Sequence, residues 1–209
     1  MIGIALQVGG CRLPYAFTLD NQANIPVRII ADLLSLLTFQ STSLAFAIIG
    51  ILIITYRPAN RIGWVALLFG FVSASNDFSL LYGVCAYRDD LALPAGDQVM
   101  WLTKLASPVT LISLGLFLML FPDGQFLSSR WRRFSFTLIA AIVPLALLTL
   151  FWPGQMLHSS PNPAPEVKNP FAFSMESASS WEAVLFPLYD VLAFGFVLFG
   201  FAALFLRWR

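Results

Sequence analysis

The sequence predicts an all-α fold, an integral membrane bundle of five transmembrane helices. Of its 209 residues, 58% are hydrophobic and only 11% are charged, and the mean hydropathy is +0.79. Soluble domains carry roughly 25% charged residues, so this chain has too little charge to cover a surface that faces water. We therefore expect lipid to surround much of the protein.

Five apolar stretches are each long enough to cross a bilayer. Crossing about 30 Å of hydrocarbon at 1.5 Å per residue takes roughly 20 residues of helix. None of the stretches alternates between apolar and polar residues as a barrel strand would, so each should be a helix. The predicted spans are residues 33–56, 62–87, 99–121, 134–152 and 184–206.

The connections complete the predicted organisation. The turn at residues 57–61 is so short that the first two spans must be antiparallel neighbours. Gly63 and Gly70, two turns apart on one face, allow close helix packing. An external N-terminal segment over residues 1–30 precedes a transmembrane domain over 31–209, which contains a proline-rich external loop at 153–181.

Basic residues in the connections predict the orientation. Seven arginines belong to one side of the bundle: Arg57, Arg61, Arg130, Arg132, Arg133, Arg207 and Arg209. Cytoplasmic connections are enriched in Lys and Arg, so this side should be cytoplasmic. The N-terminus is then outside and the C-terminus inside the cell.

Few ionisable side chains lie within the spans, and those that do gather in the outer half. Asp77, Lys104 and Asp190 are expected there together with Gln40. A charge at the bilayer centre costs about 2.5–3.5 kcal/mol on insertion scales. One interpretation is a polar pocket that opens outward, in which Lys104 pairs with Asp77 or Asp190. The alternative is that Lys104 and Asp32 reach the headgroups, while the two other acids are protonated or capped by hydroxyl groups.

Signals for catalysis, cofactors and nucleic acid are missing from the sequence. The net charge of +1 provides no basic field for nucleic acid. The single histidine, His158, falls in the external loop, and no glycine-rich nucleotide-binding motif is found. We therefore expect no enzyme activity, no cofactor and no metal site. A disulfide between Cys11 and Cys85 stays open, because Cys85 could equally be a small apolar side chain.

Two short sequences at the expected cytoplasmic turns are recognisable. One is Asn60-Arg61-Ile62-Gly63-Trp64, and the other is Leu120-Phe121-Pro122-Asp123-Gly124-Gln125, with Arg130-Trp131-Arg132 shortly after it. They resemble the membrane-sensing regions of a family of multi-pass bacterial sensor histidine kinases. In that family Asn-Pro-Ile-Gly-Trp follows a basic turn, and Phe-Pro-Asp-Gly-Arg leads into Pro-Arg-Trp. This chain departs from the pattern at Arg61, Gln125 and Ser129.

The resemblance implies the input half of a signalling protein in a bacterial inner membrane. The family's phosphoacceptor helix and ATP-binding domain have no counterpart in this sequence, so kinase activity is not carried over. The leading hypothesis is a non-catalytic membrane sensor, or a truncated remnant of a sensor kinase, that relays a signal through helix rearrangement. Its partners would be the lipid bilayer and either a second copy of the chain, as a homodimer, or a separate signalling chain.

Two other functions stay open at this point. The first is a small transporter or channel subunit that uses Asp77, Lys104 and Asp190 in a polar path, although such a path would need polar residues in both halves of the bilayer. The second is a membrane scaffold or assembly factor without a ligand.

Overall fold

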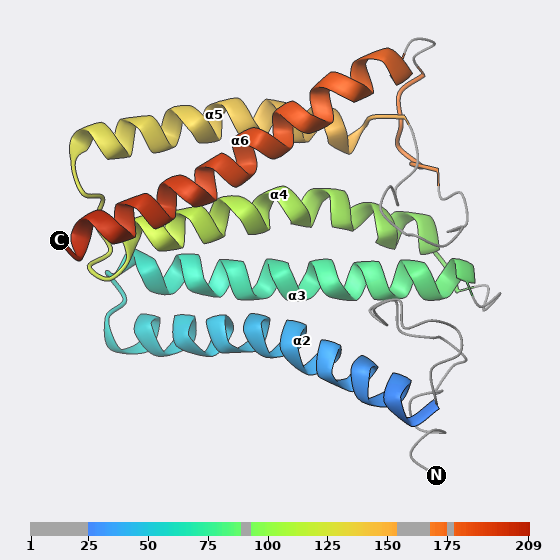
Figure 1. Cartoon of the computed structure of the whole chain (residues 1–209), viewed down its shortest axis with the longest axis horizontal. Helices are drawn as coiled ribbons and strands as arrows, with labels where there is room; N and C mark the ends of the chain where they lie inside the picture. The colour runs from blue at the N-terminus through green and yellow to red at the C-terminus, as the bar shows by residue number, and fades with distance from the viewer. Residues whose placement is uncertain (1–24, 89–92, 154–167, 175–177) are drawn as a thin grey trace.

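The fold, seen in a computed structural model, is an all-α bundle (Figure 1). The structure describes residues 25–88, 93–153, 168–174 and 178–209, and it describes the side chains of the first helix from Gln40 onward. In this part of the chain there are five helices, which we label as in Figure 1: α2 (Ile25–Tyr56), α3 (Arg61–Arg88), α4 (Gly96–Leu120), α5 (Ser129–Leu150) and α6 (Ala178–Arg207).

Each of the five predicted spans is found as a helix, but every helix begins earlier than its span. The helix α2 begins at Ile25 and so includes the last residues of the N-terminal segment predicted over 1–30, whose external position stays a prediction. Likewise α5 begins at Ser129 and takes in Arg130, Arg132 and Arg133. The prediction counted apolar residues, whereas a helix needs only intrahelical backbone bonds and can extend through polar flanks.

Three of the helices are long and apolar enough to cross a membrane, which suggests a multi-pass protein in a lipid bilayer. These are α4, α5 and the Val184–Arg207 part of α6. The part of α2 whose side chains are described, Gln40–Tyr56, is also apolar but shorter. Near its middle α3 carries the polar pair Asn76 and Asp77, which lowers its hydropathy.

The antiparallel hairpin of α2 and α3 is confirmed, and glycines hold the two helices close. A Cβ on Gly70 would lie 2.6 Å from the backbone nitrogen of Ala47, and one on Gly50 would lie 2.6 Å from that of Leu67. A Cβ on Gly63 would likewise lie 2.9 Å from the side chain of Ile53 in α2. Small residues allow such approaches between membrane helices, so any larger side chain here would separate the hairpin.

On the other side of α3, α4 is the central helix and also contacts α5 and α6. Phe196 of α6 is fully buried, and it fits against Gly115, where a Cβ would lie 2.4 Å from the Phe196 ring. Trp131 of α5 stacks on Phe199 of α6, with ring centroids 4.1 Å apart. These contacts make an apolar centre among α4, α5 and α6.

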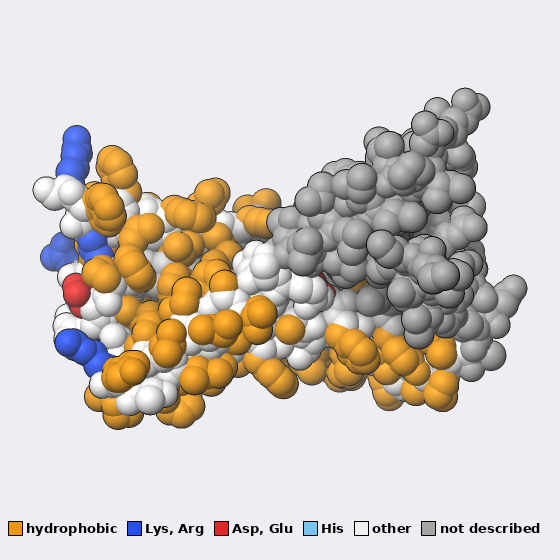
Figure 2. Space-filling view, turned by 90° about the horizontal axis from the view of Figure 1, so that it is seen from below, with side chains coloured by type: hydrophobic (Ala, Val, Ile, Leu, Met, Phe, Trp, Pro, Cys, Tyr) orange, Lys and Arg blue, Asp and Glu red, His pale blue; other side chains and the backbone are white. Residues whose placement is uncertain are grey.

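Opposite ends of the bundle carry different connections (Figure 1). The α2–α3 turn, the α4–α5 turn and the C-terminus all lie at one end. The start of α2, the start of α4 and residues 168–174 lie at the other end. On the face shown in Figure 2, Lys and Arg side chains gather at the end with the turns, and hydrophobic side chains cover much of the remaining described surface.

At the other end, residues 168–174 fold back over the end of α5. Asn169 is buried, and its side-chain amide donates hydrogen bonds to the carbonyls of Leu150 (3.0 Å) and Trp152 (2.9 Å). The indole N–H of Trp101 also donates to the Leu150 carbonyl, at 3.0 Å. The last carbonyls of a helix lack intrahelical partners, so these bonds cap α5 and tie it to α4.

Candidate functional site

The end of the bundle that carries both turns is the candidate site, which we call the junction. It consists of the α2–α3 turn (residues 57–60), the α4–α5 turn (residues 121–128) and Arg207, the last residue of α6. Asn60 of the first motif and residues 121–125 of the second belong to it, and the other motif residues lie in the adjoining helices.

The α2–α3 turn is closed by Asn60. Its backbone N–H donates to the Arg57 carbonyl at 2.9 Å, and its side-chain oxygen accepts from the N–H of Ile62 at 3.0 Å. Asn60 is therefore the N-cap of α3, where it satisfies a backbone donor that the helix itself leaves unpaired. The indole N–H of Trp64 donates to the Pro58 carbonyl at 3.2 Å, so the tryptophan braces the same turn.

The α4–α5 turn reverses the chain at Gly124. The N–H of Gly124 donates to the Leu120 carbonyl at 2.8 Å, and its φ of 74° lies in the left-handed region that favours glycine. Four residues later, Ser128 caps α5 by accepting the N–H of Trp131 at 3.4 Å. The Pro-Asp-Gly sequence thus ends one helix, and the serine begins the next.

The two sequence motifs contact each other directly, although they are about sixty residues apart. Gly124 is buried against Asn60, and a Cβ at residue 124 would lie 2.4 Å from the Asn60 side-chain oxygen. Asn60 therefore has two roles: it caps α3, and it forms the surface on which the second turn rests. This close approach requires glycine at position 124 for space as well as for its backbone angle.

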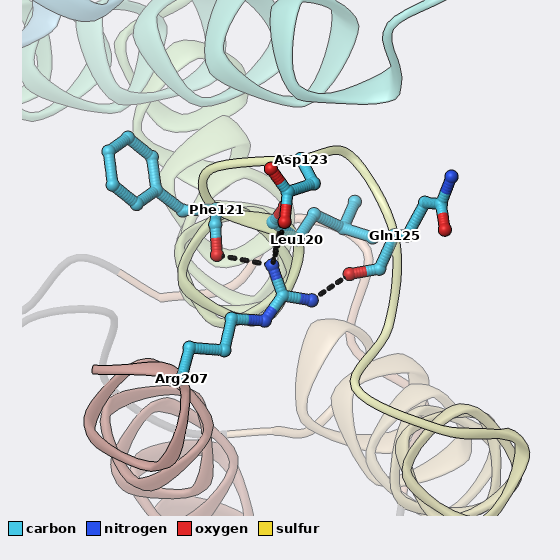
Figure 3. Close-up of polar contacts among 5 residues, drawn as sticks. All are labelled: Leu120, Phe121, Asp123, Gln125 and Arg207. Atoms are coloured by element: carbon cyan, nitrogen blue, oxygen red, sulfur yellow. Dashed lines mark hydrogen bonds and ion pairs between the residues drawn. The ribbon is translucent and has the colours of Figure 1, made fainter. Parts of the chain in front are cut away.

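Arg207, the last residue of α6, reaches from that helix into the α4–α5 turn (Figure 3). Its Nη1 donates to the carbonyls of Phe121 (2.6 Å) and Leu120 (3.4 Å), and its Nη2 donates to the carbonyl of Gln125. Its Nη1 also lies 3.9 Å from Oδ2 of Asp123, whose side chain is 75% exposed whereas that of Arg207 is 13% exposed. Most of these bonds go to backbone atoms, so Arg207 fixes the position of the turn itself.

Between the two turns lies an open cavity of about 910 Å³. Residues of both turns and of the first turns of α3 and α5 line it, and three of them are arginines: Arg57, Arg61 and Arg132. In the part of the chain that the structure describes, no three His, Cys, Asp or Glu side chains lie close enough together to hold a metal ion.

A comparison of the chain with protein-family models, curated proteins and solved structures finds no match. The resemblance to sensor histidine kinases therefore depends on the turn residues alone. The structure adds that these residues meet at one end of the bundle, where Asn60 contacts Gly124 and Asp123 lies beside Arg207.

The remaining predicted turn residues have different surroundings. Gly63 packs against α2, Trp64 is 57% exposed, and Trp131 stacks on α6. Pro122 follows Phe121 through a cis peptide bond, and Arg130 is exposed and does not line the cavity. The role of Arg207 was missed by sequence reasoning, which treated it only as a cytoplasmic charge. Only the tertiary structure brings the end of α6, and with it Arg207, next to the Pro-Asp-Gly turn.

The four residues of the predicted outer polar pocket lie on four helices. Asp77 is buried on α3, Lys104 is half-buried on α4, and Gln40 and Asp190 are exposed on α2 and α6. Lys104 lines a groove of about 100 Å³ between α4 and α5 whose other lining side chains are apolar. The groove does not include the other three residues, and their assembly into one pocket stays a prediction.

Several residues discussed from the sequence lie outside the described part of the chain. Cys11 and His158 are among them, as are the side chains of Asp32 and Cys85. The open question of a disulfide therefore stays as the sequence left it.

Proposed function

We propose that this chain is a non-catalytic input module of a bacterial membrane signalling system. In this proposal all five helices span the bilayer, the junction is cytoplasmic, and the N-terminus is outside. A stimulus changes the relative positions of the helices, and the end of α6 transmits this movement to the cytoplasmic side. The observation that carries the proposal is the set of bonds from Arg207 to the α4–α5 turn.

The junction links all the helices whose ends meet there. Arg207 binds the α4–α5 turn, Gly124 of that turn rests on Asn60, and Asn60 caps α3. Movement of any one helix against the others therefore changes the surroundings of the last residue of α6. This is the arrangement that a relay needs, because the output must differ between two positions of the bundle.

The strength of the Arg207 contacts suits a switch. A hydrogen bond from a charged donor contributes about 1.5–3 kcal/mol, and coupling between sites in allosteric proteins is typically about 1–3 kcal/mol. Forming or breaking one or two of these bonds is therefore enough to change the balance between two states. Larger contacts, such as the buried packing of Phe196 on Gly115, are better suited to hold the bundle together.

A transport function has less support. A path for ions needs polar groups along its whole length. The described side chains of the buried cluster of α4, α5 and α6 are instead mostly apolar, and Tyr189 is the one member with a polar side-chain atom. The cluster consists of Met119, Ile142, Ala146, Tyr189, Ala193, Phe196 and Ala203.

The test is a fusion in which the catalytic region of a dimeric histidine kinase follows Arg209. Autophosphorylation is measured in proteoliposomes for the unmodified fusion, for Arg207→Met and for Arg209→Met. Arg209 is exposed at the same end, so the second substitution is a matched loss of charge. We expect Arg207→Met to change basal activity about fivefold or more, and Arg209→Met to leave it nearly unchanged.

A second series inserts one to seven residues between Arg207 and the kinase. If α6 transmits a rotation, activity should rise and fall with the helical period of 3.6 residues. Equal activity of Arg207→Met and the unmodified fusion, together with no periodic response, would contradict the proposed relay.

A further inference from the structure

The cavity between the two turns has a positively charged lining. Arg57, Arg61 and Arg132 all line it. None of them lies within ion-pair distance of a carboxylate among the residues that the structure describes. Three guanidinium groups around one opening repel one another, so an anion between them would be stabilising.

Among the described residues that line the cavity, Asp123 is the only carboxylate, and Arg207 is its ion-pair partner. Asp123 lies 3.9 Å from Arg207, which comes from α6 and is not part of the cavity wall. One carboxylate against three arginines leaves the cavity lining with a net positive charge, and Asp123 already has Arg207 as a neighbour.

Two helices also begin at the cavity. Asn60 and Arg61 are the N-cap and first residue of α3, Ser128 and Ser129 are those of α5, and all four line the opening. The first N–H groups of a helix have no intrahelical acceptor, and each side-chain cap satisfies one of them. Helix N-termini carry partial positive charge and bind phosphate groups readily. Here two such termini face the same space as the three arginines.

We propose that the junction cavity binds a phosphate group, held by Arg61 and Arg132 from two different helices and supported by Arg57. Guanidinium groups bind phosphate oxygens through paired hydrogen bonds. The phosphate belongs to the headgroup of an anionic lipid or to a free phosphate ion, since the two share this chemistry. The site goes beyond the proposed function, because binding here requires no signalling partner.

Binding would strengthen the contact between the two turns. Arg61 begins α3 and Arg132 belongs to the first turns of α5, so a shared anion bridges helices that otherwise meet here through Asn60 and Gly124. Exposed Trp64, on the first turn of α3, donates its indole N–H to the carbonyl of Pro58, which lines the cavity. Tryptophan at this position is typical of the membrane–water interface, which is the depth of lipid phosphates.

The experiment uses the full chain in dodecyl maltoside, a detergent without phosphate. Native mass spectrometry and thermal unfolding measure binding of phosphatidylglycerol, of diacylglycerol with the same acyl chains, and of inorganic phosphate against chloride at equal ionic strength. Arg61→Gln/Arg132→Gln is compared with Arg130→Gln/Arg133→Gln, which removes the same charge from exposed residues outside the cavity.

We expect saturable binding of at least one phosphate-bearing probe, and no binding of diacylglycerol. The Arg61/Arg132 variant should bind about tenfold or more weakly, whereas the Arg130/Arg133 variant should retain nearly full affinity. Binding of phosphatidylglycerol alone would identify a lipid site, and binding of inorganic phosphate would identify a site for the free ion.

Absence of binding for both phosphate probes would overturn the proposal. So would equal loss in the two double variants, because it would show that the positive surface as a whole attracts anions. A matching far-UV circular dichroism spectrum for each variant checks that the bundle is folded.

Discussion

Substitution of Gly124 by alanine tests the contact between the two turns most directly. Gly124 has a φ of 74°, and a Cβ there would lie 2.4 Å from Oδ1 of Asn60. Moving that oxygen away has an energetic cost, because it accepts a hydrogen bond from the N–H of Ile62 and caps α3.

The expected loss of stability has two parts. An alanine in the left-handed region costs about 1–2 kcal/mol. Displacing Asn60 from its capping position costs about 0.5–2 kcal/mol more. The free energy of unfolding should therefore fall by about 1.5–4 kcal/mol in Gly124→Ala.

Unfolding by sodium dodecyl sulfate in mixed micelles, followed by far-UV circular dichroism, measures this change. Gly195→Ala is the matched control, because a Cβ at Gly195 in α6 meets nothing within 4 Å. There alanine should leave stability unchanged or raise it by up to about 1 kcal/mol, since glycine is a poor helix former.

A double variant separates the two parts of the loss. In an Asn60→Ala background the clashing oxygen is gone, so adding Gly124→Ala should cost only the backbone part, about 1–2 kcal/mol. The reasoning is refuted if Gly124→Ala is as stable as the unmodified protein, or if the two substitutions are strictly additive.

Three further outcomes are expected elsewhere in the molecule. A Cβ at position 115 would lie 2.4 Å from the ring of Phe196, so Gly115→Val should create a clash and lower the free energy of unfolding by about 1–3 kcal/mol. Adding Phe196→Leu should restore part of that stability, and no restoration would count against this packing. Asn169→Ala removes two hydrogen bonds to the end of α5 and should cost about 1–3 kcal/mol, with faster amide exchange confined to that end; uniform exchange would argue against a local cap. For topology, in a chain whose Cys11 and Cys85 are replaced by serine, a cysteine at Gln125 should react with a membrane-impermeant maleimide only after cells are opened, whereas one at Ser174 should react in intact cells; the reverse pattern would invert the proposed orientation.

Much of the fold was predictable because hydropathy and helix length are local properties. The apolar stretches placed all five helices, and the short turn at residues 57–61 made α2 and α3 antiparallel neighbours. Helix ends were less accurate. Residues 129–133 are mostly polar, and residues 25–30 are apolar apart from Arg28, yet both segments continue helices. A backbone bonded to itself tolerates such polar side chains at the edge of an apolar span.

The candidate site was predictable only in its pieces. Asn60, Asp123 and Gly124 stood out as turn residues, since capping and left-handed turns favour those residue types. Arg207 gave no such signal, because a guanidinium after an apolar span has the same appearance whether it contacts lipid or protein.

By itself, the sequence determined that the chain is made of apolar helices and that seven of its ten arginines lie in or beside alternate connections. Both properties follow from the solubility of each segment in lipid or water, which needs no knowledge of its neighbours. Only the tertiary structure decided that Gly124 rests on Asn60, that Arg207 closes the α4–α5 turn, and that Arg57, Arg61 and Arg132 surround one cavity. Those contacts join residues far apart in the chain, and they depend on how the helices pack, which no single segment specifies.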